Sequence, residues 1–163
     1  MNAPFRIDVM KEGDVDAVAA IAGPTHMDAA HVRDELQRPW SRMWVAREAD
    51  GGVVAYLVAW HVADELHVLN VATREDRRRR GMARALMQEV VTYARAHRVA
   101  HVLLEVRRSN RPAIGLYRSV GFFAIGVRAR YYPDDEDAVE MVLALDPDTG
   151  AIVVRDDEVR LDG

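Results

Sequence analysis

The chain has 163 residues, of which half are hydrophobic and 29% are charged, a balance typical of a single soluble globular domain. It contains no cysteine, which excludes disulfides, thiolate metal sites and a cysteine nucleophile. The net charge is −4, and the arginines and the acidic residues gather in separate clusters. Nucleic-acid binding is therefore not expected, because it requires a broad basic face. No apolar run is long enough to span a membrane, and the N-terminus lacks the features of a signal peptide. We therefore expect a cytoplasmic enzyme or binding protein with neither a nucleic-acid nor a membrane partner.

The spacing of apolar residues divides the chain into strands and helices. The predicted strands are residues 5–9, 41–47, 53–62, 67–72, 99–106, 122–131 and 138–145, and residues 151–155 are a candidate for a final strand. The predicted helices are residues 15–22, 29–37, 82–94 and 113–119. Asp14 and Asp28 stand at the N-cap positions of the first two helices, and Asn110 precedes the last. This order predicts a mixed α/β (α+β) fold, with a mostly antiparallel sheet of six to seven strands and helices on both faces.

No internal repeat, linker or change in composition divides the chain. We therefore expect a single domain over residues 1–163, with a core of about residues 4–145 and a C-terminal extension over residues 146–163. The strand at 67–72 and the strand that ends at Val106 are joined through a long helix. They should consequently be parallel neighbours connected by a right-handed crossover.

The stretch from Leu66 to Ala94 reads as an apolar strand, an arginine-rich turn, a glycine and an amphipathic helix. A helix that begins after this turn directs its free backbone N–H groups and the positive end of its dipole at whatever lies in front of it. Gly81 allows a ligand to approach the backbone closely. The pattern predicts an anion site for a phosphate or pyrophosphate, although neither a Walker loop nor a Rossmann fingerprint is present. The alternative is a solvated run of charges before an ordinary helix.

Three side chains further along are candidates for chemistry. Glu105 ends an otherwise apolar strand, where burial is expected to raise its carboxyl pKa and make it a better proton acceptor near neutral pH. The alternative is that Glu105 faces solvent or pairs with Arg107. Tyr117 lies on the apolar face of a short helix, a position at which a tyrosine is usually a core residue. Asn110 is most simply a helix cap.

Taken together, residues 78–83, 104–110 and 113–122 resemble the GNAT acyltransferase pattern in order and spacing. Residues 104–110, followed by the Tyr-Tyr-Pro of residues 131–133, look like the RimI-type ribosomal-protein-alanine N-acetyltransferases within that superfamily. The likeness covers roughly residues 53–145. It implies the GNAT fold, in which the central parallel pair of strands splays at the acetyl-CoA site.

The resemblance implies transfer of an acetyl group from acetyl-CoA to an amine through a ternary complex. In this interpretation Glu105 removes a proton from the amine, directly or through a water, and Tyr117 protonates the leaving thiolate. The cofactor-binding positions it implies are Val71, Ala72, Arg78, Arg79, Arg80, Gly81, Met82, Ala83, Asn110 and Tyr117. The acceptor-binding positions are Asn70, Arg130, Tyr131 and Tyr132. No metal is implied, because none of the six histidines forms a metal-binding spacing with nearby carboxylates.

Three hypotheses for the function remain open, and the first two differ in the acceptor of the acetyl group. In the first, the acceptor is the N-terminal α-amine of a protein, namely an alanine of a ribosomal protein. The second is a small-molecule amine or an internal lysine, and the third is a non-catalytic sensor that only binds acyl-CoA. Residues 23–27 depart from the aromatic-Pro-Trp-Ser stretch of the RimI type, so the acceptor pocket is expected to differ. The acidic residues 134–137 are expected either to attract a cationic N-terminus or to form a solvated hairpin tip. The oligomeric state is expected to be a monomer or homodimer.

Overall fold

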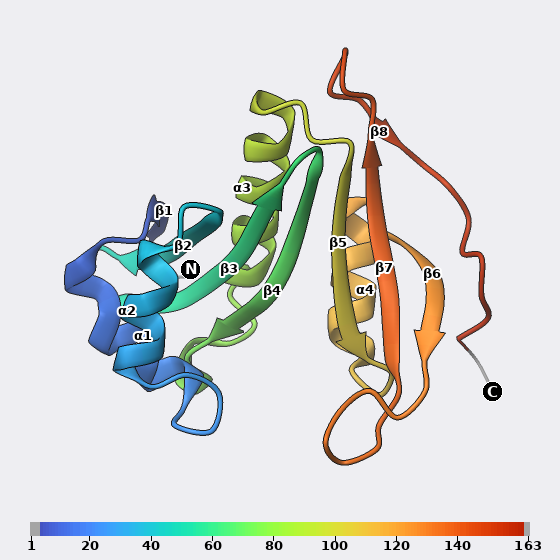
Figure 1. Ribbon diagram of the computed structural model, residues 1–163. Coiled ribbons are helices and arrows are strands. Elements are labelled where there is room, and N and C mark those ends of the chain that lie inside the picture. The colour runs from blue at the N-terminus through green and yellow to red at the C-terminus, as the bar shows by residue number, and fades with distance from the viewer. Residues whose placement is uncertain (1–3, 162–163) are drawn as a thin grey trace. The chain divides into compact units, whose positions relative to one another are not determined.

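The structure is a computed structural model that describes residues 4–161 (Figure 1). The helices of this part of the chain are α1 Val15–Ala22, α2 Ala29–Gln37, α3 Met82–Ala96 and α4 Arg111–Val120. The strands are β1 Phe5–Val9, β2 Ser41–Glu48, β3 Val53–Val62, β4 Glu65–Thr73, β5 His101–Arg107, β6 Phe123–Arg128, β7 Ala138–Leu145 and β8 Ile152–Val153. The predicted mixed α/β fold is confirmed.

The strands are hydrogen bonded in the order β1-β2-β3-β4-β5-β7-β6, and β8 pairs with β7 outside this path. Seven strands therefore form the continuous path, and the two-residue β8 adds an eighth to the predicted six to seven. β4 and β5 form the predicted parallel pair, in which Glu65, Leu66 and His67 lie opposite His101, Val102 and Leu103. The pairing covers only these three positions of a nine-residue and a seven-residue strand.

The chain is organised as two compact units. The first unit comprises the residues up to His61 together with Leu69–Val90, and the second comprises Val62–Val68 together with the residues from Val91 onward. β4 and α3 each contribute to both units.

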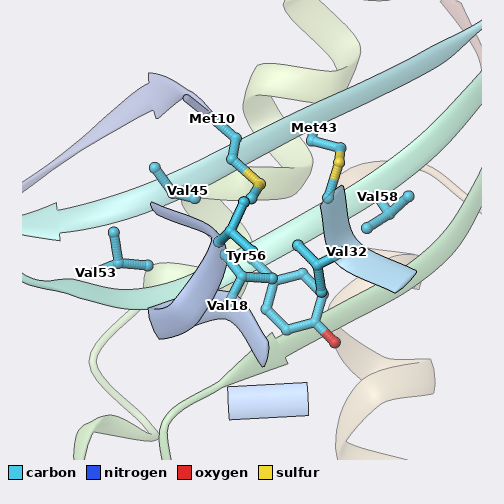
Figure 2. Packing of buried hydrophobic residues seen from close by; sticks show 9 residues of the cluster. Met10, Val18, Val32, Met43, Val45, Val53, Tyr56 and Val58 are labelled. Atoms are coloured by element: carbon cyan, nitrogen blue, oxygen red, sulfur yellow. The ribbon is translucent and has the colours of Figure 1, made fainter. Parts of the chain in front are cut away.

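The core of the first unit forms around β2 and β3 (Figure 2). Tyr56 of β3 is fully buried and packs in one cluster with Val18 of α1 and Val32 of α2. The residues of β3 from Val53 to Ala59 are all buried, as expected for a strand covered on both faces. Figure 1 shows α1 and α2 on one face of this part of the sheet and the start of α3 on the other.

Asp14 has a different role from the one predicted. Its side chain does not cap α1 but forms two 2.7 Å bonds with the guanidinium of Arg47 on β2. The bonds from Arg47 hold the pKa of the Asp14 carboxyl below its ordinary value. Arg47 also donates to Asp8. The predicted cap at Asp28 is confirmed, because its Oδ1 accepts a 2.9 Å bond from the backbone of His31.

In the second unit β7 lies between β5 and β6. The chain beyond Leu145 runs along the outer edge of β6, as the red segment of Figure 1 shows. The backbone N–H of Glu158 donates to the carbonyl of Ala124, and the Ala124 N–H donates to the carboxylate of Asp157. Asp157 also pairs with Arg118 of α4. The C-terminal extension therefore covers the edge of β6 and ties it to α4.

β6 is shorter than predicted. It ends at Arg128 rather than Tyr131, because Arg130 adopts a left-handed backbone with φ of 53°, which a strand cannot continue through.

Candidate active site

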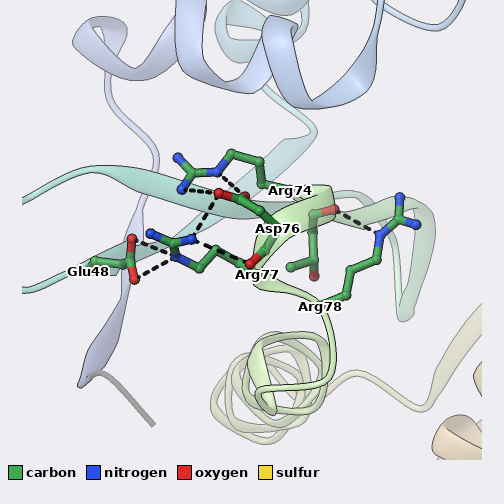
Figure 3. A network of polar contacts seen from close by, with 6 residues as sticks. Glu48, Arg74, Asp76, Arg77 and Arg78 are labelled. Carbon is green, nitrogen blue, oxygen red and sulfur yellow. Dashed lines mark hydrogen bonds and ion pairs between the residues drawn. The ribbon is translucent and has the colours of Figure 1, made fainter.

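The turn between β4 and α3 contains arginines that are paired with carboxylates and arginines that are not (Figure 3). Arg77 donates to both oxygens of Glu48 on β2, at 3.0 and 3.1 Å, and to Asp76 at 2.9 Å. Arg74 donates to both carboxylate oxygens of Asp76, at 2.6 and 3.1 Å. These contacts fix the start of the turn against β2, so Arg77 has a structural role.

Within the described residues, no carboxylate pairs with Arg78, Arg79 or Arg80. Arg78 reaches the carbonyl of Thr73 with a long bond of 3.4 Å. Within residues 4–161, neither the Arg79 nor the Arg80 side chain forms a hydrogen bond or an ion pair. Three adjacent cations without a carboxylate partner repel one another, so an anion that binds here would be stabilised.

The backbone of the same turn is arranged to receive an anion. Arg79 and Gly81 have left-handed φ values of 65° and 83°, and α3 begins at Met82. Outside the helix, the N–H groups of residues 78–81 donate to no acceptor in the described chain. Alternating left-handed residues turn successive N–H groups toward one side and form a concave anion site. The side chain of Met82 is buried, so at that position only the backbone is available to a ligand.

Asn70 on β4 is held by a buried tyrosine. Its Nδ2 lies 2.6 Å from the hydroxyl of Tyr56, whose pKa is raised to about 12 by burial. The phenol is therefore neutral at physiological pH and fixes the orientation of the amide. With Nδ2 bonded to Tyr56, the Asn70 oxygen remains available as an acceptor. Val71 and Ala72, the next positions of β4, are half-buried.

In the second unit the carboxylate of Glu105 is paired with an imidazole. Its Oε2 lies 2.7 Å from Nε2 of His67 on the parallel strand β4, and its side chain is 17% exposed. The bond to His67 lowers the pKa of the Glu105 carboxyl and outweighs the opposing effect of burial. The prediction that burial raises this pKa is wrong. Glu105 also does not pair with Arg107, and it is ionised at neutral pH.

A second carboxylate lies beside this pair. Glu140 of β7 is directly opposite Glu105 in the antiparallel register. Arg128 of β6 donates a 2.9 Å bond to Glu140, and its positive charge contributes to the lowered pKa of Glu105. Arg128 thus offsets the repulsion between two neighbouring carboxylates.

Tyr117 on α4 is 7% exposed, and burial raises its pKa to about 12. The phenol therefore keeps its proton at neutral pH. Its ring contacts Phe122, with centroids 5.8 Å apart, but its hydroxyl forms no hydrogen bond within the described residues. The electrostatic influence of Tyr132 also raises the Tyr117 pKa, by less than burial does. Tyr117 combines a core ring with an unused proton donor.

The loop between β6 and β7 carries three predicted acceptor-binding residues. Tyr131 is 46% exposed and meets Tyr132 edge-on, with ring centroids 5.1 Å apart. The backbone of Arg130 donates a 3.0 Å bond to Asp137, while the Arg130 side chain forms no pair in the described chain. Asp134 and Glu136 bind Arg107, so much of the acidic charge expected to attract a cationic acceptor is already neutralised.

Asn110 caps α4, since its Oδ1 accepts a 3.3 Å bond from the backbone of Ala113. Ala83 is half-buried in the first turn of α3. Neither observation tests the cofactor role that the family resemblance assigns to these positions. Those roles stay predictions.

Sequence reasoning missed His67 and Arg107 as parts of the site. The signal for His67 was available, because the predicted parallel pairing of its strand with the strand of Glu105 places the two side chains on neighbouring strands. Arg107 carried no comparable signal, because its carboxylate partners are 27 and 29 residues away in a loop. Among the residues described, no group of three or more His, Asp or Glu side chains is arranged to hold a metal ion. None of the helices in residues 4–161 is long and apolar enough to cross a membrane.

Known proteins resemble this chain in sequence. A sequence profile described as "Acetyltransferase (GNAT) family" matches residues 15–122. The chain is 37% identical over 99 residues to the ribosomal protein bS18-alanine N-acetyltransferase of Escherichia coli K12, across 59% of this chain and 67% of the relative. It is 32% identical over 157 residues to the N-alpha-acetyltransferase of Sulfurisphaera tokodaii, across 86% of this chain and 93% of the relative.

The fold is matched as well. The crystal structure of the ribosomal-protein-S18-alanine N-acetyltransferase from Escherichia coli superposes with a TM-score of 0.79 at 29% identity. The superposition covers 86% of this chain and 94% of that chain. Sequence and fold together confirm the family resemblance carried by the three motifs.

Proposed function

Because the chain belongs to the GNAT acetyltransferase family, we propose that this N-acetyltransferase transfers the acetyl group of acetyl-CoA to the N-terminal α-amine of a protein. The names of its relatives in Escherichia coli and Sulfurisphaera tokodaii support an N-terminal amine, and the first supports an alanine of a ribosomal protein. The observation that carries the chemistry is the presence, in one unit, of an ionised carboxylate paired with an imidazole and of a protonated phenol without a partner.

In this proposal the turn after β4 binds the diphosphate of acetyl-CoA. The N–H groups of residues 78–83 and the cationic side chains of Arg78, Arg79 and Arg80 supply the donors and the charge. Val71 and Ala72 offer backbone groups to the pantetheine arm and to the oxyanion that forms at the thioester carbonyl. Asn110 is a further contact for the pantetheine arm.

The acceptor amine must lose a proton before it can attack a carbonyl carbon. An α-ammonium group has an ordinary pKa of about 8, so a nearby acceptor for its proton accelerates the reaction at neutral pH. We assign this role to Glu105, directly or through a water. Because the pKa of Glu105 is lowered, the carboxylate is present in its basic form throughout the neutral range. His67 holds the carboxylate at 2.7 Å and is placed to share the proton.

Attack by the amine nitrogen forms a C–N bond, and the tetrahedral adduct then collapses with cleavage of the C–S bond. Tyr117 donates its proton to the departing sulfur, which leaves as the thiol of coenzyme A. The proton that the nitrogen loses as the amide forms then restores the phenol of Tyr117. A phenol with a pKa of about 12 holds this proton until the sulfur develops negative charge. No covalent enzyme intermediate is needed, in agreement with the absence of cysteine.

The acceptor is the part of the proposal that most needs a direct test. We suggest measuring thiol release from acetyl-CoA with three amines: a peptide that begins with Ala-Arg, a peptide with a blocked N-terminus and one internal lysine, and spermidine. We expect release with the first peptide and little release with the other two. Release with spermidine or the lysine peptide alone would instead establish the second acceptor class, for which the departure from the RimI pattern at residues 23–27 leaves room.

A further inference from the structure

Arg107, at the end of β5, makes several contacts with the loop between β6 and β7. The chemistry proposed above gives Arg107 no role and so does not explain these contacts. We call residues 129–137 the acceptor loop. The Nη1 of Arg107 lies 2.9 and 3.0 Å from the two carboxylate oxygens of Asp134 and 2.9 Å from Oε1 of Glu136. Its guanidinium carbon lies 4.1 Å from the centroid of the Tyr132 ring, within the range of a cation–π contact.

Glu136 extends this arrangement to the next turn of the chain. Its Oε1 binds Arg107, and its Oε2 accepts a 2.9 Å bond from the backbone N–H of Ser109. Ser109 lies in the turn that connects β5 to α4, the helix that carries Tyr117. One carboxylate therefore joins the acceptor loop both to the end of β5 and to the start of α4.

Arg107 also lies on the same face of β5 as Glu105, because residues two apart in a strand share a face. The acceptor loop is thereby anchored to the strand that carries the proposed base. Within the loop, the backbone N–H of Asp135 donates to the carbonyl of Tyr132, and the Tyr132 N–H donates to the carbonyl of Glu136. These bonds close the turn around the anchored side chains.

From these contacts we propose that Arg107 is a positioning residue for the acceptor. It fixes Tyr132 by stacking on its ring and fixes the loop through Glu136, so that the exposed Tyr131 is presented in one orientation. This inference rests on the proposed function, since it assigns the loop to the acceptor. Arg107 itself touches neither the thioester nor the amine.

Substitution of Arg107 tests the inference through the separation of KM from kcat. For Arg107→Gln we expect the KM of the acceptor peptide to rise by about tenfold or more, while kcat at saturating peptide and the KM of acetyl-CoA change by less than about threefold. Arg107→Lys keeps the charge but loses the planar fork and the stacking surface, so we expect an intermediate KM. The matched control is Arg98→Gln, which removes an exposed pair with Asp148 in the same unit and should leave all three parameters unchanged.

Hydrogen exchange supplies a readout that does not depend on the acceptor. In Arg107→Gln the amides of residues 132–136 should exchange faster than in the parent, with no change at β7. A double-mutant cycle with Glu136→Ala should be non-additive, because both substitutions remove the same anchor. Unchanged exchange in the loop, or a fall in kcat with the acceptor KM unaltered, would overturn the inference. If the parent enzyme fails to acetylate the peptide, the proposed acceptor is wrong, and the exchange experiment still decides whether Arg107 orders the loop.

Discussion

Two arginine-rich segments of the chain, residues 77–80 and 107–111, have opposite electrostatic environments. In the turn between β4 and α3, Arg79 and Arg80 are without an acidic partner in the described chain, and the backbone N–H groups around them are also unused. At the end of β5, by contrast, Arg107 binds two carboxylates and an aromatic ring, and Arg108 binds Asp137. The sequence alone does not show which of these arginines are paired with carboxylates.

The difference separates structural charge from charge available to a ligand. A paired arginine holds two segments together, as Arg77 does with Glu48 and Arg107 does with Glu136. An unpaired cluster of cations at the start of a helix is stabilised when an external anion binds. The same distinction applies to Tyr117, whose hydroxyl is unpaired while Glu105 is paired.

The largest expected effect comes from removing the unpaired hydroxyl. Tyr117→Phe keeps the buried ring and removes only the proton donor, so kcat should fall by about 100-fold or more, in the range typical of general acid catalysis. Because the ring remains, the affinity for CoA should stay within about twofold of the parent. Steady-state kinetics and calorimetry with CoA check both parts. Unchanged turnover would remove Tyr117 from the proposed mechanism.

Removing the carboxylate of Glu105 should lower kcat less than removing the Tyr117 hydroxyl, and it should also change the pH dependence of the reaction. Glu105→Gln should lower kcat by about 30-fold, since water can partly replace the base. The Glu105 pKa is lowered, so in the parent the carboxylate becomes protonated only below its ordinary value of 4.5. In Glu105→Gln, which has no base to remove the proton, kcat/KM should rise with pH through the ionisation of the acceptor amine, near about 8. In the parent, kcat/KM should change much less between pH 6 and 8, because the ionised Glu105 accepts the proton.

One pH profile would contradict the lowered pKa of Glu105. A limb between pH 5 and 7 that is present in the parent and absent in Glu105→Gln would show that the carboxylate titrates in that range. The pairing with His67 would then not describe the working enzyme.

Backbone geometry in the arginine-rich turn should have the next largest effect. Gly81 has φ of 83°, a conformation that a β-branched residue adopts only with strain, so Gly81→Val should weaken CoA binding by about tenfold. Gly115→Ala is the matched control, because Gly115 lies within α4, has no atom within 4 Å of an added Cβ and needs no left-handed backbone. It should leave CoA affinity unchanged. Equal CoA affinity in parent and Gly81→Val would separate the turn from the cofactor.

The smallest expected effect distinguishes the arginines of this turn from one another. Arg79→Gln and Arg80→Gln should each weaken CoA binding by about threefold, with a larger loss at low ionic strength, as expected for exposed charges. Arg77→Gln should instead lower the melting temperature by a few degrees and leave CoA affinity in place, because it breaks the contact with Glu48. If Arg77→Gln weakened CoA binding while Arg79→Gln and Arg80→Gln lowered only the melting temperature, the distinction between paired and unpaired charge would be contradicted.

Much of the fold could be predicted from local patterns. The period of the apolar residues located the four helices, and the long helix between two apolar strands predicted the parallel pair of β4 and β5. The cap at Asp28 followed from its position before a helix. Asp14 occupies an equivalent position, but its carboxylate binds Arg47, which is 33 residues away and cannot be identified from the local sequence.

The candidate site could be predicted only in part, for the same reason. The motifs identified Glu105 and Tyr117, but the sign of the Glu105 pKa shift depends on His67, 38 residues earlier. The acidic run at residues 134–137 suggested a surface for a cationic acceptor, yet Arg107 and Arg108 neutralise three of its carboxylates. Local sequence shows which groups are charged, whereas tertiary pairing decides which of those charges remain available.

The most direct test of the account is to locate the transferred acetyl group. An Ala-Arg peptide that also carries one internal lysine should be incubated with acetyl-CoA and the enzyme and then fragmented in a mass spectrometer. The account predicts a single acetyl group on the N-terminal alanine in the parent and almost none with Tyr117→Phe. Acetyl on the lysine, or equal acetylation of the alanine by Tyr117→Phe, would contradict it.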